Sequence, residues 1–251
     1  MVQVLAVTNQ KGGGGKTTTA INVAYNLSKS GKKVLLVDLD PQGNASSGLS
    51  VSKSKATTRD VLSGKATLVE AVQATAFKNL WMLPTDAELA TLETEIATEK
   101  DRAIRLKKAL ADTEYDVVLI DCPPSLGLLT VNALTASQAV IIPVQTEYYA
   151  LEGLGQLLET MKLVRQALNP KLAILGVVMT MHNARTTLSA QVEEQLQKNF
   201  KDRLFKTVVP RNIRVAEAPS HGKPVGEYDK WSKGARAYKA LTKEISERLE
   251  K

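Results

Sequence analysis

The regular alternation of short apolar segments with longer helical patterns constrains this chain more than any other feature of its sequence. Six segments have the length and continuous hydrophobicity of strands that are buried on both faces: 2–7, 33–38, 79–83, 117–121, 139–144 and 172–180. Helical patterns lie between them, at 16–28, 103–111, 126–136, 151–168, 187–200 and 234–249. Because parallel strands need crossover connections, this order predicts an α/β fold with a mostly parallel β-sheet flanked by helices on both faces.

Two local expectations follow from the same patterns. The last helical segment is predicted to pack on the core through one apolar face, formed by Ala237, Ala240, Leu241, Ile245 and Leu249. The least regular region, 48–98, is predicted to form a short helical insertion beside the sheet.

The whole chain, residues 1–251, is predicted to form a single domain. Its length suits one large α/β unit, and neither an internal repeat nor a linker divides it. The first residues lack the pattern of a signal peptide, and Pro143 and Gly176 interrupt the longest apolar runs far short of a bilayer span. The single cysteine, Cys122, cannot form an internal disulfide. These features predict a cytoplasmic protein.

A glycine-rich segment follows the first predicted strand and opens the first predicted helix: Lys11-Gly12-Gly13-Gly14-Gly15-Lys16-Thr17-Thr18. Glycines let the backbone turn so that successive N–H groups face one anion, and the start of a helix adds unpaired N–H groups. Lys16 is placed to reach the β- and γ-phosphates of a nucleotide, and the Thr17 hydroxyl to ligate Mg²⁺. This strand–loop–helix context predicts a P-loop NTPase fold.

Position 10 departs from the ordinary P-loop pattern, which would place a glycine there. This chain has Gln10, followed by a second lysine, Lys11. A lysine at the start of the loop lies beside the phosphates without having to point into its own site. It is therefore free to reach a nucleotide that is held by a second subunit.

Two acidic segments are predicted at the edge of the sheet where ligands collect. One strand ends in Asp38, with Asp40 two residues later, and another ends in Asp121. Asp121 resembles a Walker B aspartate that would hold Mg²⁺ through water, and Asp40 is the better candidate to orient the attacking water. Asp38 is equally compatible with a local capping role. The start of a Pro-Pro turn is the alternative for Asp121, and the glycine-rich loop favours the nucleotide role over it.

Four segments in order resemble the ParA/Soj partition ATPases. They are the loop at 11–18, Val37-Asp-Leu-Asp-Pro-Gln-Gly-Asn44, Ile120-Asp-Cys-Pro-Pro124 and Val209-Pro-Arg-Asn-Ile-Arg-Val-Ala-Glu-Ala-Pro-Ser-His-Gly-Lys-Pro224. The resemblance covers nearly the whole chain. The family belongs to the deviant Walker A group, with MinD and the nitrogenase iron protein. One departure is Gly14, where relatives usually carry valine.

The resemblance implies roles for the matching residues and a slow, partner-stimulated ATPase that uses ATP and Mg²⁺. Lys11 would contact phosphate across an ATP-sandwiched homodimer, and Asp40 would assist hydrolysis and metal binding. Residues of the loop, Gly12 to Thr18, would bind phosphate, with Thr17, Asp40 and Asp121 at the metal. Pro210 and Asn212 would hold the adenine, although a simple turn that closes a strand fits them equally.

Charge distribution is compatible with a polyanionic partner, either nucleic acid or an anionic membrane, and equally with a solvated surface that keeps the protein soluble. The formal net charge is +7, and residues 201–251 hold thirteen Lys and Arg against seven acids. The resemblance implies that the ATP-bound dimer binds DNA without sequence preference, and Arg185 and Arg214 match the positions linked to that activity. The alternative without a functional role is that both arginines form surface ion pairs. The resemblance further implies a partner of the ParB/Spo0J type and association with the nucleoid.

Three alternative functions remain to be weighed against this interpretation. A MinD-like membrane-associated positioning ATPase would need a C-terminal amphipathic helix with bulky apolar residues, and this chain ends Ser-Glu-Arg-Leu-Glu-Lys. A redox ATPase would need more cysteines than Cys122. A non-catalytic ATP-binding scaffold disagrees with Asp40 and Asp121. Of the two tryptophans, Trp81 is predicted to lie in the core and Trp231 is able to stack on nucleic-acid bases.

Overall fold

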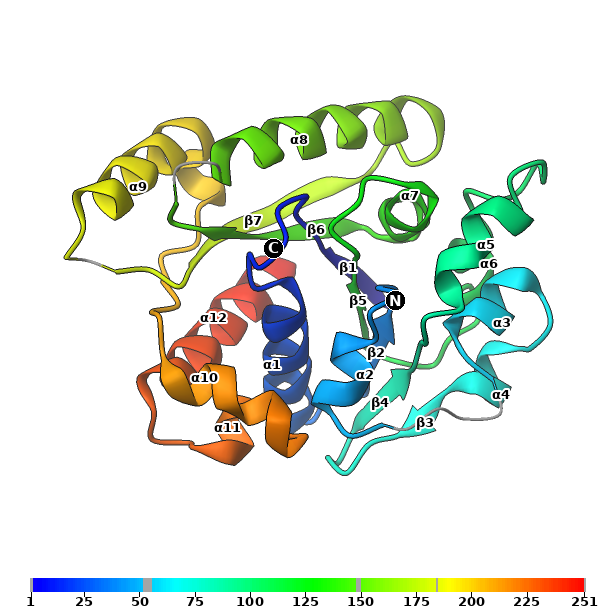
Figure 1. Ribbon diagram of the computed structural model, residues 1–251, viewed down its shortest axis with the longest axis horizontal. Helices are drawn as coiled ribbons and strands as arrows, with labels where there is room; N and C mark the ends of the chain where they lie inside the picture. Colours follow the sequence, from blue (N-terminus) through cyan, green and yellow to red (C-terminus); the bar gives the residue numbers. More distant parts are fainter. Residues whose placement is uncertain (1, 52–55, 148–149, 184, 251) are drawn as a thin grey trace.

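The computed structural model describes residues 2–51, 56–147, 150–183 and 185–250. Within these residues the strands form a seven-stranded sheet in the order β3–β4–β2–β5–β1–β6–β7 (Figure 1). All neighbours are parallel except β3, which runs antiparallel to β4. The predicted α/β class is confirmed. The strands are β1 (Gln3–Val7), β2 (Val34–Asp38), β3 (Gln73–Ala74), β4 (Leu80–Leu83), β5 (Val117–Asp121), β6 (Ala139–Gln145) and β7 (Ala173–Thr180).

Helices cover both faces of the sheet (Figure 1). Alternate residues of β1 enter two separate apolar cores, Leu5 and Val7 on the side of α1 and α12, Val4 and Ala6 on the side of α7 and α8. The longer helices are α1 (Lys16–Lys29), α7 (Leu128–Ala136), α8 (Ala150–Ala167), α9 (Thr187–Phe200) and α12 (Lys233–Leu249). The shorter ones are α2 (Asn44–Gly48), α3 (Thr58–Ser63), α4 (Leu68–Ala71), α5 (Leu89–Glu95), α6 (Arg105–Ala109), α10 (Ile213–Glu217) and α11 (Val225–Tyr228), with 3-10 turns η1 (Lys201–Arg203) and η2 (Ala218–His221).

The centre of the sheet brings three chain segments to one edge. β1 lies between β5 and β6, and β5 also pairs with β2. In this register Val7 and Asp38 are both partners of Asp121, so the loops that follow β1, β2 and β5 leave the sheet side by side. This carboxyl edge is where open parallel sheets bind their ligands.

The opposite, amino edge is closed by side chains. Between β6 and β7 the register shifts, so that Leu175 has no partner in the ladder. The Arg248 guanidinium from the end of α12 donates to the carbonyls of Leu175 (2.9 Å) and Leu204 (2.9 Å), and it pairs with Glu244 at 3.0 Å. Glu244 in turn accepts the backbone N–H groups of Lys206 and Thr207. Every charge of this cluster is therefore satisfied internally.

The elements predicted from the sequence are found, with three differences. The strand ends shift by no more than one residue, whereas the helices expected at 103–111 and 126–136 are shorter. The region 48–98 contains helices, and it also adds β3 to the sheet. β3 has only two residues and depends on pairing with β4, so it cannot be predicted from a local sequence pattern. In α12 the predicted Ala240 is exposed and Tyr238 is buried instead, because the buried stripe follows 234, 238, 241 and 245.

Candidate phosphate-binding site

The loop between β1 and α1 is a glycine turn at the carboxyl edge. Gly13 (φ 73°) and Gly15 (φ 87°) have left-handed backbone conformations that favour glycine. Gly12 and Gly13 form an exposed tip with open space where a side chain would project. α1 starts after Gly15 with no capping side chain and no acid in its first turn, where Thr17 and Thr18 lie half-buried. The first N–H groups of α1 are thus left for an anion.

Lys16 is the buried cation of this site. Its side chain begins α1, the residue is 6% exposed, and its Nζ donates to the Lys11 carbonyl at 3.2 Å. Burial lowers the pKa of Lys16, whereas Asp121, Cys122 and Asp40 act to raise it. A buried lysine with a single backbone acceptor has donors left for a ligand oxygen.

The side chain of Lys11 binds an acid in another loop. Its Nζ lies 2.9 Å from Oε2 of Glu147, just after β6, and the two side chains are 24% and 47% exposed. The Lys11 side chain is therefore held by the segment that follows β6.

Asp121 is a buried carboxylate that the described residues leave incompletely hydrogen-bonded. It ends β5 and its exposure is 0%. Among the described residues neither Oδ1 nor Oδ2 has a partner in full hydrogen-bond geometry, although the Thr17 hydroxyl is close enough to act on the carboxylate and lower its pKa. Burial, and then the nearby Asp38, raise the pKa of Asp121 well above its ordinary value. Burying an acid in this state lowers the stability of the fold unless a cation or a water molecule supplies the missing partner. The Thr17 hydroxyl and Asp40 are close enough to act on this carboxylate, and the three groups together would give Mg²⁺ the oxygen ligands that it prefers.

Asp38 and Asp40 have different tasks, although they are two residues apart. Asp38 is fully buried, and its Oδ2 accepts from both the N–H (2.8 Å) and the hydroxyl (2.7 Å) of Ser46 in α2. Burial raises the pKa of Asp38 to about 6. Asp40 is 7% exposed, and its Oδ1 accepts the N–H of Gln42 at 3.0 Å. Asp38 thus fixes the loop, whereas Asp40 keeps its Oδ2 free of donors among the described residues.

The segment with Pro210 and Asn212 lies beside the end of β7. Pro210 bridges to His182, just after that strand, and the Thr180 hydroxyl at its end donates to the Gly14 carbonyl at 2.8 Å. Asn212 caps α10, because its Oδ1 accepts the N–H of Val215 at 3.3 Å. The structure therefore shows Pro210 and Asn212 in a turn, which was one of the two alternatives from the sequence. The turn lies next to β7, whose last residue, Thr180, binds the glycine-rich loop.

The two arginines predicted to contact DNA are in different states. Arg185 is exposed, and within the described part of the chain its guanidinium has no acidic partner. Arg214 is paired with Glu217 at 2.9 Å and with Asp229 at 3.5 Å, and the contact with Glu217 raises its pKa. The ion-pair alternative thus describes Arg214 and not Arg185.

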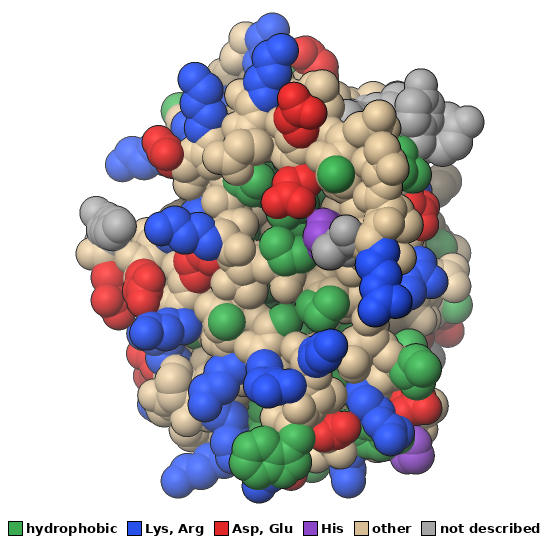
Figure 2. All heavy atoms as spheres, turned by 90° about the vertical axis from the view of Figure 1, so that its left-hand side faces the viewer, with side chains coloured by type: hydrophobic (Ala, Val, Ile, Leu, Met, Phe, Trp, Pro, Cys, Tyr) green, Lys and Arg blue, Asp and Glu red, His purple; other side chains and the backbone are tan. Residues whose placement is uncertain are grey.

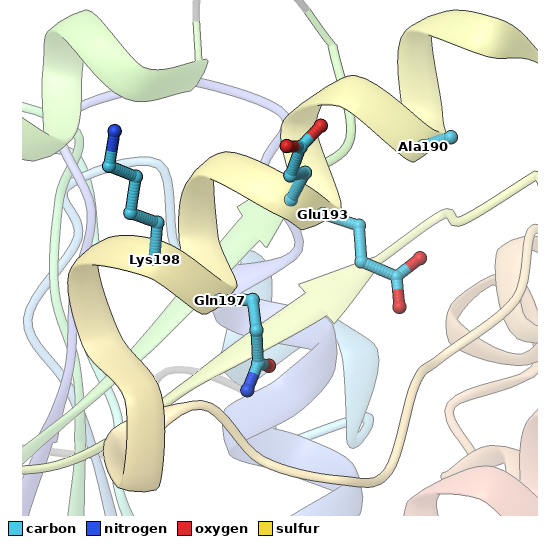
Figure 3. Close-up of a pocket in the computed structure, with 5 residues that line it drawn as sticks. Ala190, Glu193, Gln197 and Lys198 are labelled. Carbon is cyan, nitrogen blue, oxygen red and sulfur yellow. The ribbon is translucent and has the colours of Figure 1, made fainter.

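A separate hollow of about 750 Å³ lies on α9, away from the glycine loop. Figure 3 shows its labelled residues along this one helix, among them Glu193 and Lys198. Its lining carries both signs of charge and comes from α9 alone: Ala190, Glu193, Glu194, Gln197 and Lys198. It lacks the convergent polar groups from several elements that mark a built site.

Several residues that shape the site were missed by sequence reasoning. Asn9 holds the loop from both sides, because its Nδ2 donates to the Pro143 carbonyl (2.7 Å) and its Oδ1 accepts the Lys11 N–H (3.4 Å). Thr180 and Glu147 contact the same loop. The available signal was positional: all three lie at or just after the carboxyl end of a strand, where this edge is built.

Comparisons of the sequence agree with this geometry. A family model described as "AAA domain" matches residues 2–174. The sporulation initiation inhibitor protein Soj of Bacillus subtilis is 52% identical over 250 residues, which cover 98% of this chain and 99% of that protein. The chromosome partitioning protein ParA of Caulobacter vibrioides is 49% identical over 253 residues, with 98% and 95% covered.

Solved structures share the same architecture. A cobyrinic acid a,c-diamide synthase from Mycobacterium smegmatis, with bound ADP and magnesium, has a TM-score of 0.87 at 37% identity and covers 100% of this chain and 96% of its own. The septum site-determining protein MinD from Pyrococcus horikoshii, complexed with Mg-ADP, has a TM-score of 0.80 at 29% identity, with 99% and 98% covered. On its sequence and its fold together, this chain belongs to the ParA/Soj family.

Proposed function

We propose that this chain is an ATPase of DNA partition that binds Mg-ATP on the loop from Lys11 to Thr18. The observation that carries the proposal is the uncapped start of α1 behind an open glycine tip, with Lys16 buried beside it. Those features suit a triphosphate. The chromosome-partitioning names of relatives such as Soj and ParA, and the nucleotides and magnesium in the solved neighbours, support the same function.

The residues of the site supply charge and position for phosphoryl transfer. The loop N–H groups and Lys16 would neutralise the β- and γ-phosphates, and Asp40 would orient the attacking water through its free oxygen. Asp121 and Thr17 would hold a magnesium ion, which when bound neutralises charge that develops on the phosphate oxygens. Pro210 and Asn212 would contact the adenine at the rim.

We further propose that two copies close over their nucleotides. Lys11 is held by a partly exposed ion pair with Glu147, which solvent weakens, so its side chain is able to swing towards a partner's phosphate. The charge of a nucleotide oxygen would compete with the carboxylate of Glu147. ATP would thereby convert a monomer into a sandwich dimer, and hydrolysis would release it.

The dimer would bind DNA through its cations and so associate with the nucleoid. Figure 2 shows Lys and Arg distributed over the side of the molecule that carries α9, α10 and α12. Dimerisation doubles the number of phosphates that this side neutralises, and affinity rises steeply with that number. A DNA-bound partner of the ParB/Spo0J type would stimulate hydrolysis and free the dimer.

Membrane positioning in the manner of MinD is less well supported. Among the described helices, none has the length and hydropathy to cross a bilayer. The apolar face of α12 is occupied, since Leu241 and Ile245 are 0% exposed and the hydroxyl of Tyr238 lies 3.4 Å from that of Thr19 in α1. A helix that packs this way has no free face to place in an interface.

DNA retention with ATP separates these functions. With Mg-ATP, wild type should co-sediment with DNA and not with anionic liposomes, and Asp40→Ala should persist as a dimer on DNA because hydrolysis is blocked. Arg185→Glu should weaken DNA retention while ATP binding stays intact. Arg102→Glu, the same charge change at an exposed site between α5 and α6, is the matched control. ATP-dependent binding to liposomes alone would refute the proposal.

A further inference from the structure

Trp231 is exposed in a way that packing does not explain. Its exposure is 77%, and that of Ile213, on the neighbouring α10, is 74%. Large aromatic side chains usually cover apolar surface in folded proteins. Trp81 shows the ordinary case, since it lies half-buried in β4 with its ring 5.4 Å from that of Tyr115. An exposed tryptophan in a structured segment indicates a surface for a partner.

The backbone that carries Trp231 is fixed on both sides. Its N–H donates to Oδ1 of Asp229 at 3.1 Å, and Oδ2 of the same carboxylate lies 3.5 Å from Nε of Arg214. On the other side, Ser232 caps α12 by accepting the N–H of Ala235 at 3.1 Å. The ring is thus presented to solvent from a held main chain. A rigid aromatic side chain loses little conformational entropy when it binds.

The surroundings of the ring are cationic. Lys230 places its Nζ 5.2 Å from the ring centroid, and Lys233 and Arg236 lie in the first four residues of α12. Cations are unfavourable at that end of a helix, where the dipole is positive, and no acid offsets them there. The sequence therefore concentrates positive charge beside Trp231 against the local preference of the fold.

The acids of this segment do not neutralise these cations. Between 211 and 236 the three acids are engaged elsewhere: Glu217 and Asp229 pair with Arg214, and Glu227 accepts the Tyr25 hydroxyl at 2.6 Å. Within the described chain, five exposed cations of the segment have no acidic partner: Arg211, Lys223, Lys230, Lys233 and Arg236. Figure 2 looks at this side of the molecule. A base face and a phosphate are the two groups that such a surface complements.

We propose that Trp231 is a stacking contact for unpaired DNA bases, with Lys230, Lys233 and Arg236 on the flanking phosphates. The inference rests on the proposed DNA-binding function and adds to it a contact that is not electrostatic. Aromatic rings among cations bind single-stranded nucleic acid, because every base offers a π-face. A lipid surface is disfavoured, since Trp231 and Ile213 stand apart from any apolar helix face. Arg214 becomes a positioning residue that holds Asp229.

Fluorescence tests the contact directly, because the chain has two tryptophans. Trp81→Phe leaves Trp231 as the sole emitter, and Trp231→Phe leaves Trp81. With Mg-ATP, a single-stranded oligonucleotide should quench and shift the emission of the Trp81→Phe protein and leave that of Trp231→Phe unchanged. Far-ultraviolet circular dichroism and ATP binding establish that both variants are folded. Unchanged emission of Trp81→Phe while it is bound to the oligonucleotide would overturn the inference.

Binding at several salt concentrations separates stacking from charge. Trp231→Ala should weaken binding of a single strand by about tenfold, as expected for one lost stacking contact, with the slope of log affinity against log salt unchanged. Trp231→Phe should restore most of the affinity. Lys233→Ala should instead lower the slope by about one phosphate contact. Duplex DNA, whose base faces are covered, should lose less in Trp231→Ala.

The outcomes distinguish this inference from the function on which it rests. If wild type retains DNA with ATP and Trp231→Ala binds the single strand equally well, only the stacking contact is refuted. If wild type fails to bind any DNA, the proposed function and the inference both fall. Liposome binding that is lost in Trp231→Ala, without an effect on DNA, would show that the surface serves a membrane and would also overturn the inference.

Discussion

The two edges of the sheet treat buried charge in opposite ways. At the carboxyl edge, Asp121 is fully buried with no partner in full hydrogen-bond geometry among the described residues, and Lys16 has a single backbone acceptor. At the amino edge, Arg248 binds the carbonyls of Leu175 and Leu204 and pairs with Glu244. Both edges take charged side chains out of water, but the partners of Asp121 and Lys16 are incomplete, whereas those of Arg248 and Glu244 are supplied by the chain.

The difference separates residues that hold the fold from residues that await a ligand. A buried polar group with no partner lowers the stability of the fold. The region that contains such groups is therefore the region where a bound ligand is expected to supply the missing partners. Substitutions at the carboxyl edge should therefore reduce function and leave stability nearly unchanged. Substitutions at the amino edge should reduce stability and leave function nearly unchanged. Four substitutions sharpen or break this contrast.

The largest effect is expected for Lys16→Ala. Loss of a preorganised cation at the phosphates should weaken Mg-ATP binding by about 10²–10³-fold. Because Lys16 donates to one carbonyl only, the free energy of unfolding should stay close to that of wild type. Isothermal titration calorimetry and denaturant unfolding measure the two quantities. Lys29→Ala, at the exposed end of the same helix, is the control. If Lys16→Ala kept the ATP affinity of wild type, the proposal that this loop binds the phosphates would be wrong.

Arg248→Ala should show the reverse pattern. The substitution leaves the carbonyl of Leu175, which has no ladder partner, without its donor, and it leaves Glu244 without its cation. The expected loss is about 2–4 kcal/mol of unfolding free energy, from several hydrogen bonds to a charged group that is 19% exposed. ATP affinity of the folded fraction should be unchanged. Lys239→Ala, exposed on the same helix, should have no such effect on urea unfolding.

Local patterns predicted the parts of this molecule that local residues determine. The strands were found because each is a continuous apolar run, and the loop because glycines, Lys16 and Thr17 are contiguous. The ion pair of Lys11 with Glu147 joins residues 136 positions apart, so no window of sequence contains it. The unpaired Leu175 and its Arg248 donor depend equally on the register of two strands and the end of a distant helix.

Within the site, the sequence predicted which groups gather but not their division of work. Asp38 and Asp40 have the same chemistry, and only the fold shows that Ser46 saturates the first. The sequence allows Asn212 either to contact adenine or to form a turn. Its role as the N-cap of α10 follows from the ordinary preference for Asn before a helix. The sequence predicts the same role for Arg185 and Arg214, whereas among the residues that the structure describes only Arg214 has acidic partners.

Asp121→Asn tests the carboxyl edge from the side of stability. Burial already raises the pKa of Asp121 and so favours its neutral form. The neutral amide should therefore leave the unfolding free energy at that of wild type or up to about 1 kcal/mol above it. Hydrolysis of ATP should fall sharply, since the carboxylate proposed to hold Mg²⁺ is gone. Thermal unfolding without nucleotide and phosphate release with nucleotide measure both effects. A variant less stable than wild type would show that Asp121 has a structural partner and would break the contrast between the edges.

Gly14→Ala is the finest test, because it asks whether every glycine of the loop serves the ligand. Gly14 has no positive φ, and an added methyl would meet the Lys11 carbonyl at 3.4 Å, an ordinary contact. Fewer conformations of the unfolded chain should stabilise this variant by about 0.4–1 kcal/mol, with ATP affinity retained. Gly13→Ala, at φ 73°, should instead lose about 1–2 kcal/mol and bind ATP weakly, because alanine resists the left-handed conformation that opens the cradle. If thermal unfolding and nucleotide titration show equal losses in both variants, the loop acts as one rigid unit. Opposite signs would locate the phosphate cradle in the left-handed turns at 13 and 15 and leave position 14 as part of the scaffold.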